Sequence, residues 1–260
     1  MNETPLVHLD RVVLRFGEKT VLNGVNLKIF SKDRLVVLGQ SGSGKSTILR
    51  LILGILRPTS GDVRYKHLRV HRLSRSKLNL LRARIGMVYQ YSALISSLNV
   101  RDNLALPVEE LGRQSRKAID ELVAEKLALV GMSGTEEKMP SELSGGMRKR
   151  VSLARALMLE PELILFDEPS AGLDPVMSSV IDELIISLTE KTSTTSVIVT
   201  HEMDSAFRIA TRMAMLYQGS IILDEVPESF RNADNPVVRQ FVSGEVTGPI
   251  TEFAQNADPS

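Results

Sequence analysis

The segment 39-GQSGSGKST-47, which directly follows the apolar run 35-LVVL-38, constrains the fold more than any other part of this sequence. Glycines and small hydroxyl residues favour neither helix nor strand, whereas apolar residues at helical spacing begin at Ile48. The pattern GxxxxGKS at residues 39–46, between a buried strand and a helix, is typical of a phosphate-binding loop. Such a loop predicts an α/β fold whose parallel strands hold the ligand beyond their carboxyl ends.

The chemistry expected of this loop is the binding of a nucleoside triphosphate. Its glycines allow successive N–H groups to turn toward phosphate oxygens, and the positive end of the following helix adds to that attraction. Lys45 would neutralise the β- and γ-phosphates, and the Ser46 hydroxyl would be a ligand of Mg²⁺. An ordinary glycine- and serine-rich turn is the alternative, which the Lys-Ser pair disfavours. The expected nucleotide-binding residues of the loop are Gly39, Gln40, Ser41, Gly42, Ser43, Gly44, Lys45, Ser46 and Thr47.

Two adjacent carboxylates follow a second buried strand in 163-LILFDEP-169. Uncompensated charge is costly behind four apolar residues, so the pair is expected to have a function. Nucleotide hydrolysis needs an acid that holds the metal and a base for the attacking water. Asp167 would hold Mg²⁺ through a bound water, and Glu168 would orient the attacking water or accept its proton. The alternative is a strand end capped by two solvated acids.

A second phosphate-binding helix start is predicted at 143-LSGGM-147. Ser144 suits a helix N-cap, and Gly145 and Gly146 leave the first turn open for the approach of an anion. One loop already cradles the nucleotide. Two such sites in one chain make sense if each serves a different nucleotide, one of them bound by another copy.

The order and spacing of these three motifs resemble those of the ATP-binding cassette (ABC) family, from about Leu6 to Phe230. The resemblance implies an α/β P-loop NTPase with a mostly parallel core sheet, an N-terminal antiparallel β part and a helical subdomain at about residues 91–160. The cassette would occupy residues 1–245, followed by a C-terminal tail at residues 246–260. In similar proteins two cassettes face head to tail, and each ATP lies between one P-loop and the signature of the opposite cassette.

The same resemblance implies four further site residues. Phe16 falls where the family stacks an aromatic ring on adenine, although Tyr is commoner there and a core Phe is the alternative. Gln90 looks like the glutamine that touches Mg²⁺ and water, and Asp174 would lie at the dimer contact. His201, which follows a strand, would contact the γ-phosphate as a switch residue. The catalytic residues implied are Glu168, His201 and Gln90, and the metal ligands are Ser46, Gln90 and Asp167.

Three details resemble the cassettes of Mla/MCE-type phospholipid transporters: the segment 92-SALISSLNVRDNLALP-107, Met147 where Gln is commoner, and the end segment 238-VRQFVSGEVTGPI-250. This resemblance implies an ATP- and Mg²⁺-dependent homodimer on the cytoplasmic face of the inner membrane. An integral permease would be its main partner, with an MCE-domain lipid-binding protein and a small STAS-domain subunit as further ones. The residues expected to line an apolar groove for the permease are Ala93, Leu94, Ile95 and Leu98.

Other functions stay open or are disfavoured by composition. A cassette for an amino acid or lipoprotein system is one rival, and a soluble ABC ATPase without a permease is another. The absence of Cys excludes thiolate nucleophiles and thiolate metal sites. With no Trp and a net charge of +1, nothing predicts binding to nucleic acid. No secretory signal is visible, and the apolar runs are shorter than the roughly 18 residues of a membrane span.

One segment is strongly basic. Between Val63 and Arg84 there are eight Lys and Arg residues and no acid. A solvated basic subdomain is the first interpretation, and contact with anionic lipid or an acidic partner is the second. His67 and His71, four residues apart, are expected to face solvent, because basic surroundings would repel a metal cation.

Hydrophobic patterning predicts the remaining elements. Strands are expected at residues 6–16, 21–30, 35–38, 84–89, 163–166 and 197–199, with a hairpin at 213–223. Helical structure is expected from Ile48 to Leu56, at 202–210, and from about Ala93 to Leu159 with breaks at Pro107, Gly112, Gly131 and Pro140. From Gly244 onward the chain is expected to be extended.

Overall fold

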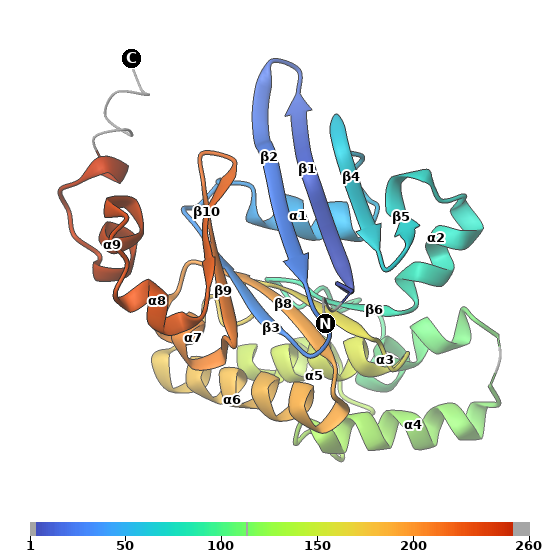
Figure 1. The fold of residues 1–260 in the computed structure, drawn as a ribbon. Coiled ribbons are helices and arrows are strands. Elements are labelled where there is room, and N and C mark those ends of the chain that lie inside the picture. The colour runs from blue at the N-terminus through green and yellow to red at the C-terminus, as the bar shows by residue number, and fades with distance from the viewer. Residues whose placement is uncertain (1–3, 113, 252–260) are drawn as a thin grey trace.

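The computed structural model describes residues 4–112 and 114–251, and this part of the chain contains two sheets, with helices packed mainly against the larger one (Figure 1). Neighbouring strands of the larger sheet pair in parallel, except β9 with β10. This arrangement confirms the predicted mostly parallel core sheet. Its strands, in spatial order, are β10 (Ser220–Glu225), β9 (Arg212–Tyr217), β3 (Arg34–Leu38), β8 (Thr195–Thr200), β7 (Leu163–Asp167) and β6 (Ile85–Val88).

The smaller sheet is antiparallel and confirms the predicted N-terminal β part. Buried and more exposed residues largely alternate along its first strand, because only one face of this sheet lies on the core. Helix α1 (Lys45–Ile52) lies between the two sheets (Figure 1), and its apolar side chains join one hydrophobic cluster with both of them. The strands, in spatial order, are β2 (Lys19–Ile29), β1 (Val7–Phe16), β4 (Ser60–Tyr65) and β5 (Leu68–Arg69).

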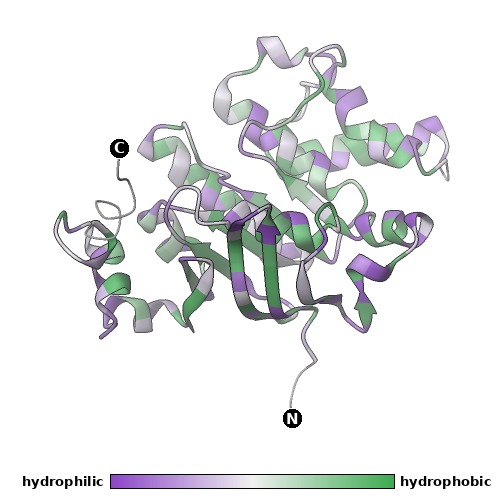
Figure 2. Cartoon of the chain, turned by 90° about the horizontal axis from the view of Figure 1, so that it is seen from above, coloured by the Kyte–Doolittle hydropathy of each residue, from purple (hydrophilic) through white to green (hydrophobic). Residues whose placement is uncertain are grey.

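Both faces of β3 are buried, which explains the run of apolar residues before the loop. Leu35 and Val37 belong to the cluster shared with α1, whereas Val36 and Leu38 belong to the cluster under α5 and α6. The central strands are accordingly mostly green in Figure 2. The other helices are α2 (Arg75–Arg82), α3 (Val100–Glu109), α4 (Arg116–Leu129), α5 (Gly145–Leu157), α6 (Pro175–Thr192), α7 (Met203–Ile209), α8 (Pro227–Arg231) and α9 (Pro236–Ser243), with 3₁₀ turns at Val70–Arg72 and Pro140–Glu142.

Two helix boundaries differ from the sequence-based expectation. Helix α1 ends at Ile52 rather than Leu56, because Gly54 adopts a left-handed φ of 64° and ends the helix before Pro58. Pro107 was predicted to break the helical stretch but lies inside α3. Its ring removes one backbone donor, yet the next turn still forms, with the Glu110 N–H donating to the Leu106 carbonyl at 3.0 Å.

The expectation of an extended chain beyond Gly244 is wrong for its first residues. The side chain of Gln240 on α9 is buried and accepts a hydrogen bond from the Ile250 N–H at 2.8 Å. Its amide donates to the Glu245 carbonyl and to the Thr251 hydroxyl. Ile250 is buried in the main hydrophobic cluster, so residues 245–251 fold back onto the domain. The rest of the predicted tail, residues 252–260, lies outside the described residues.

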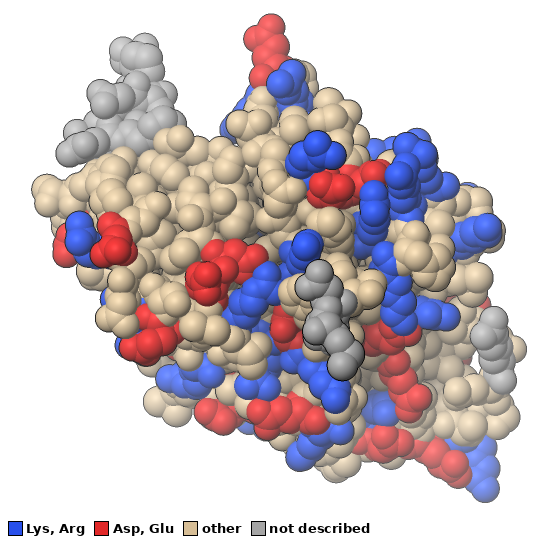
Figure 3. Space-filling view, in the orientation of Figure 1, with Lys and Arg blue, Asp and Glu red and all other residues tan. Residues whose placement is uncertain are grey.

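Two acids contact part of the basic segment 63–84, which contributes to the blue surface over β5 and α2 in Figure 3. Asp62 pairs with Arg64 and Arg69, and Glu162 pairs with Lys66 and Arg84. Two carboxylates balance two of the eight positive charges, so the segment stays basic, and its contact with an anionic partner stays a prediction.

The prediction that both histidines of this segment face solvent is half wrong. His67 is exposed, but His71 is half-buried, and its Nε2 lies 3.5 Å from Asp62 Oδ1. Asp62 directly precedes the basic segment, and β4 and the chain that follows it bring Arg69 and His71 back to its carboxylate.

Candidate functional site

The loop between β3 and α1 has a backbone conformation that requires glycine. A Cβ atom on Gly39, where φ is +155°, would lie 2.4 Å from the carbonyl oxygen of Leu216. Gly44 forms the N-cap of α1 with a left-handed φ of 104°. The loop therefore curls directly over the first turn of α1, where free N–H groups and the helix dipole favour an anion.

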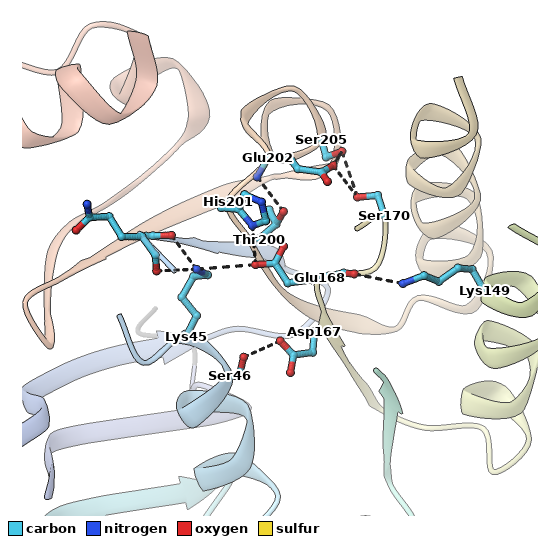
Figure 4. Close-up of polar contacts among 12 residues, drawn as sticks. Lys45, Ser46, Lys149, Asp167, Glu168, Ser170, Thr200, His201, Glu202 and Ser205 are labelled. Atoms are coloured by element: carbon cyan, nitrogen blue, oxygen red, sulfur yellow. Dashed lines mark hydrogen bonds and ion pairs between the residues drawn. The ribbon is translucent and has the colours of Figure 1, made fainter. Parts of the chain in front are cut away.

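Lys45 is buried at the start of α1, and its ammonium group faces the loop (Figure 4). It donates hydrogen bonds to the Gly39 carbonyl at 2.7 Å and to the Gln40 carbonyl at 3.0 Å. Its Nζ atom also lies 3.9 Å from Glu168 Oε1. Burial lowers the pKa of Lys45, although the charges of Glu168 and Asp167 act in the opposite direction. A ligand phosphate would supply the negative charge that this partly desolvated cation lacks.

Ser46 and Asp167 form an oxygen pair across the gap between α1 and the end of β7. The Ser46 hydroxyl donates to Asp167 Oδ1 at 2.7 Å (Figure 4). Within the described residues, no group of three or more His, Cys, Asp or Glu side chains is arranged to hold a metal ion. A hard cation such as Mg²⁺ fits this pair, because it takes few protein oxygens and completes its shell with water and phosphate.

Glu168 and His201 meet beyond the ends of β7 and β8. His201 Nδ1 lies 3.0 Å from Glu168 Oε1 (Figure 4). The backbone of Glu168 is left-handed, with a φ of 49°, and its N–H donates to the Val199 carbonyl at 3.0 Å. The second carboxylate oxygen of Glu168, Oε2, is buried and has no hydrogen-bond partner among the residues that the structure describes. A strained residue with an unsatisfied buried oxygen marks a position held for a ligand or a reacting group.

A cavity of about 270 Å³ collects most of the residues expected to act on the nucleotide. It also includes Val21 of β2, which the sequence analysis did not anticipate. Phe16, predicted to stack on adenine, does not line this cavity and is 53% exposed, so the alternative of a core Phe is wrong. The expected residues that line the cavity are Ser41, Gly42, Gly44, Lys45, Ser46, Thr47, Gln90, Glu168 and His201.

The predicted signature and Asp174 lie outside this cavity. Ser144 is the N-cap of α5, as predicted, and its hydroxyl accepts a hydrogen bond from the Met147 N–H at 3.3 Å. Asp174 is the N-cap of α6 and accepts from the N–H groups of Val176 and Met177, both at 3.0 Å. Both N-cap residues are exposed. Neither residue lines the nucleotide cavity of its own chain.

Polar residues beside the cavity were missed by sequence reasoning. Glu202 accepts from the hydroxyl of Ser170 at 3.1 Å and from that of Ser205 at 3.4 Å (Figure 4), which connects the end of β7 with α7. Lys149 is buried on α5 and donates to main-chain carbonyls at the edge of the cavity. In the sequence, only its position after His201 points to Glu202. Lys149 is indistinguishable from an ordinary basic residue on the surface of a helix.

Comparison with known proteins settles the family. Residues 22–171 match the ABC transporter family profile. The chain belongs to this family. It is 35% identical to the intermembrane phospholipid transport system ATP-binding protein MlaF of Haemophilus influenzae, over 96% of this chain and 94% of MlaF. It is 38% identical to the probable ribonucleotide transport ATP-binding protein mkl of Mycobacterium tuberculosis, over 94% of this chain and 68% of that protein.

A solved structure agrees with this assignment. The dimeric post-hydrolysis structure of the cassette MJ0796, bound to ADP and Pi, is 32% identical, with a TM-score of 0.77 over 85% of this chain and 98% of that chain. The chain is therefore an ATP-binding cassette of the ATPase class. Within the part that the structure describes, no helix is long and apolar enough to cross a bilayer.

Proposed function

We propose that this cassette binds ATP in the cavity over its P-loop, pairs with a second copy and drives a separate membrane permease for phospholipid. The observation that carries the proposal is the convergence of Lys45, Glu168 and His201 around that cavity. These side chains come from α1 and from the carboxyl ends of two parallel strands, where α/β sheets hold their ligands.

In the proposed binding step, the loop N–H groups and Lys45 hold the β- and γ-phosphates. The Lys45 ammonium uses two of its three N–H donors on main-chain carbonyls, which leaves the third for the ligand. Ser46, Asp167 and Gln90 would hold Mg²⁺, which supplies charge neutralisation on the phosphate oxygens when it is bound. Phe16, exposed at the end of β1, is available to stack on the adenine ring.

In the proposed hydrolysis step, Glu168 acts as the base. A water oxygen bonds to the γ-phosphorus while the bond from that phosphorus to the bridging oxygen of ADP breaks. Glu168 takes the proton of this water on its carboxylate, one oxygen of which has no hydrogen-bond partner among the described residues. His201 holds the other oxygen of the carboxylate at 3.0 Å and contacts the γ-phosphate. ADP and phosphate are the products.

The signature supports a dimer in this proposal. Ser144, Gly145 and Gly146 begin α5 outside the cavity of their own chain, so they are available to a nucleotide on the second copy. Asp174, exposed at the start of α6, would lie at the same contact. The MJ0796 cassette forms a dimer, which supports the same arrangement here. The dimer would close when it binds two ATP molecules and reopen after hydrolysis, and these movements would drive the permease.

The permease would dock beside Gln90. Tyr89, Tyr91 and Ile95 are 41%, 87% and 40% exposed, which is a high exposure for three large apolar side chains so close together. Ala93 is also exposed, while Leu94 and Leu98 are half-buried, so the predicted groove residues are divided between surface and core. The cassette would then sit on the cytoplasmic face of the inner membrane.

The nearly full-length similarity to MlaF favours phospholipid as the substrate. By the same analogy, an MCE-domain lipid-binding protein and a STAS-domain subunit would complete the assembly. The similarity to mkl, named as a ribonucleotide transport protein, supports a cassette for another substrate as the second candidate.

The deciding experiment is purification of the tagged chain from its native membranes, with mass spectrometry of the subunits and of co-purifying lipid. We expect an integral permease and phospholipid. At a fixed ATP concentration, ATPase activity of the complex in vesicles should respond to phospholipid composition and not to added ribonucleotides other than ATP. The opposite response would favour the second candidate. Capture of the chain without any integral membrane protein would contradict both and leave a soluble ATPase.

A further inference from the structure

Lys149 lies on α5, two residues beyond the signature, and is 5% exposed. Its side chain points away from solvent toward the edge of the large sheet (Figure 4). The ammonium group donates to the main-chain carbonyl of Gln90, and to that of Glu168 at 3.4 Å. One buried side chain thus connects the signature helix with the backbone of two residues that the proposed hydrolysis step uses.

This lysine is not a typical core residue. Burial lowers the pKa of Lys149, and the nearby carboxylates of Glu202 and Glu168 only oppose that effect. A buried ammonium group is unfavourable unless acceptors surround it. A methionine of similar length would fill the same space without that cost. The position therefore suits lysine because of the two carbonyls that it holds.

Further along α5, Ser152 and Arg155 bind the main chain just after Gln90. The Ser152 hydroxyl donates to the Ser92 carbonyl at 3.0 Å. The Arg155 guanidinium donates to the carbonyls of Ser92 at 3.0 Å and Ala93 at 2.7 Å. Ser92 and Ala93 have left-handed φ values of 61° and 48°, which are unfavourable for residues with a Cβ atom. Side chains of α5 therefore fix the chain just after Gln90 in a strained conformation.

We infer that Lys149 is a positioning residue that couples the two ATP sites of the dimer. The inference rests on the proposed function, in which the start of α5 serves the ATP of the second copy. Gln90 and Glu168 serve the ATP of their own chain. When α5 shifts on contact with one nucleotide, Lys149 transmits the shift to the backbone that carries the groups acting on the other.

The test compares Lys149→Met with Lys126→Met in the purified full chain. Lys126 is an equally suitable buried lysine, 6% exposed on α4, but it pairs with Glu125 and Glu160 away from the cavity. The readouts are the ATP dependence of phosphate release, the affinity for a fluorescent ATP analogue below the dimerisation concentration, and the thermal midpoint. We expect wild-type hydrolysis to have a Hill coefficient above 1, up to about 2 for two coupled sites.

For Lys149→Met we expect kcat to fall about tenfold, the Hill coefficient to approach 1 and the affinity of the monomer to stay within about twofold. Lys149→Arg, which keeps charge and donors, should restore the Hill coefficient. Lys126→Met should keep wild-type kinetics. Wild-type kinetics in Lys149→Met would overturn the inference, and so would an equal kinetic loss in both methionine variants. A wild-type protein that neither dimerises with ATP nor hydrolyses it cooperatively would instead refute the proposed dimer.

Discussion

At the scale of single residues, Glu168 carries the sharpest prediction. Glu168→Gln keeps the shape of the side chain and its reach to His201 but removes the ability to accept a proton. Hydrolysis should fall by about 10²- to 10⁴-fold, the usual contribution of a positioned base, with ATP affinity unchanged. Phosphate release and nucleotide titration measure the two quantities. The stalled variant should also accumulate as a dimer with ATP in size-exclusion chromatography, and near-normal turnover would show that another group is the base.

Lys45 carries a prediction about binding rather than chemistry. Lys45→Ala removes the buried cation that faces the loop. The ATP affinity should fall about 10- to 100-fold, the equivalent of one charge-assisted hydrogen bond. Equilibrium titration with ATP measures the change. Lys117→Ala, at an 88% exposed side chain paired with Glu121 and far along the chain from the loop, is the matched control and should bind normally. Equal affinities of the two variants would contradict the proposed role of the loop.

At the scale of secondary-structure elements, Glu162 joins three of them. It precedes β7 and accepts a hydrogen bond from Tyr65 of β4 at 3.0 Å. It also pairs with Lys66 at 2.6 Å and with Arg84, which precedes β6, at 3.3 Å. Burial alone would raise the pKa of Glu162, but the hydrogen bonds from Lys66 and Tyr65 and the charges of Lys66 and Arg84 outweigh it and lower the pKa below 4.5.

A lowered pKa in the folded state means that ionised Glu162 stabilises the fold above the ordinary pKa, and that this stability is lost as the pH falls through the lowered value. Glu162→Gln should therefore lower the thermal midpoint at pH 7, and the difference from wild type should shrink as the pH falls below about 4.5. Thermal unfolding between pH 7 and pH 3 measures it. Tyr65→Phe removes one donor and should give a smaller difference with the same pH trend. A pH-independent difference would contradict the ion-pair explanation.

The sequence predicts elements well where local chemistry decides them. The runs 35–38 and 163–166 are buried on both faces, and the glycine pattern at 39–46 fits only one kind of loop. Prediction fails where tertiary contacts decide. Pro107 stays inside α3, and residues 245–251 fold back because the buried Gln240 side chain binds their main chain.

The residues of the candidate site also fall into those that the local sequence predicts and those that only tertiary packing reveals. Motif residues could be named because phosphate and Mg²⁺ chemistry demands particular side chains at fixed spacing. Val21 and Lys149 could not be named, because they reach the cavity region from β2 and α5 only through the packing of distant segments. A valine and a lysine carry no local signal of that placement.

At the scale of the whole molecule, the cavity holds the groups for binding and hydrolysis, but the predicted signature stands outside it. Either the signature does not bind nucleotide, or a second copy of the chain places its signature against the nucleotide of this one. Gly145 offers a way to distinguish these cases without disturbing the fold. A Cβ atom there would come no closer than 3.6 Å to Leu173, an ordinary contact, whereas one on Gly146 would lie 2.7 Å from the Met177 side chain.

Gly145→Asp should therefore fold normally, and its carboxylate at the start of α5 even suits the helix dipole. It should repel the phosphates of a nucleotide held by the second copy. We expect the affinity of the monomer for ATP to stay within about twofold while hydrolysis falls about 100-fold, because like charges at an interface cost several kcal/mol. ATP-dependent dimers should be absent in light scattering. Gly134→Asp adds the same charge in a turn where φ is +77°, a conformation that Asp tolerates better than most residues, and where no described residue other than the chain neighbours lies within 4 Å of an added Cβ; it should hydrolyse normally. Normal hydrolysis by Gly145→Asp would mean that one subunit encloses its nucleotide alone, because Gly145 cannot reach the cavity of its own chain.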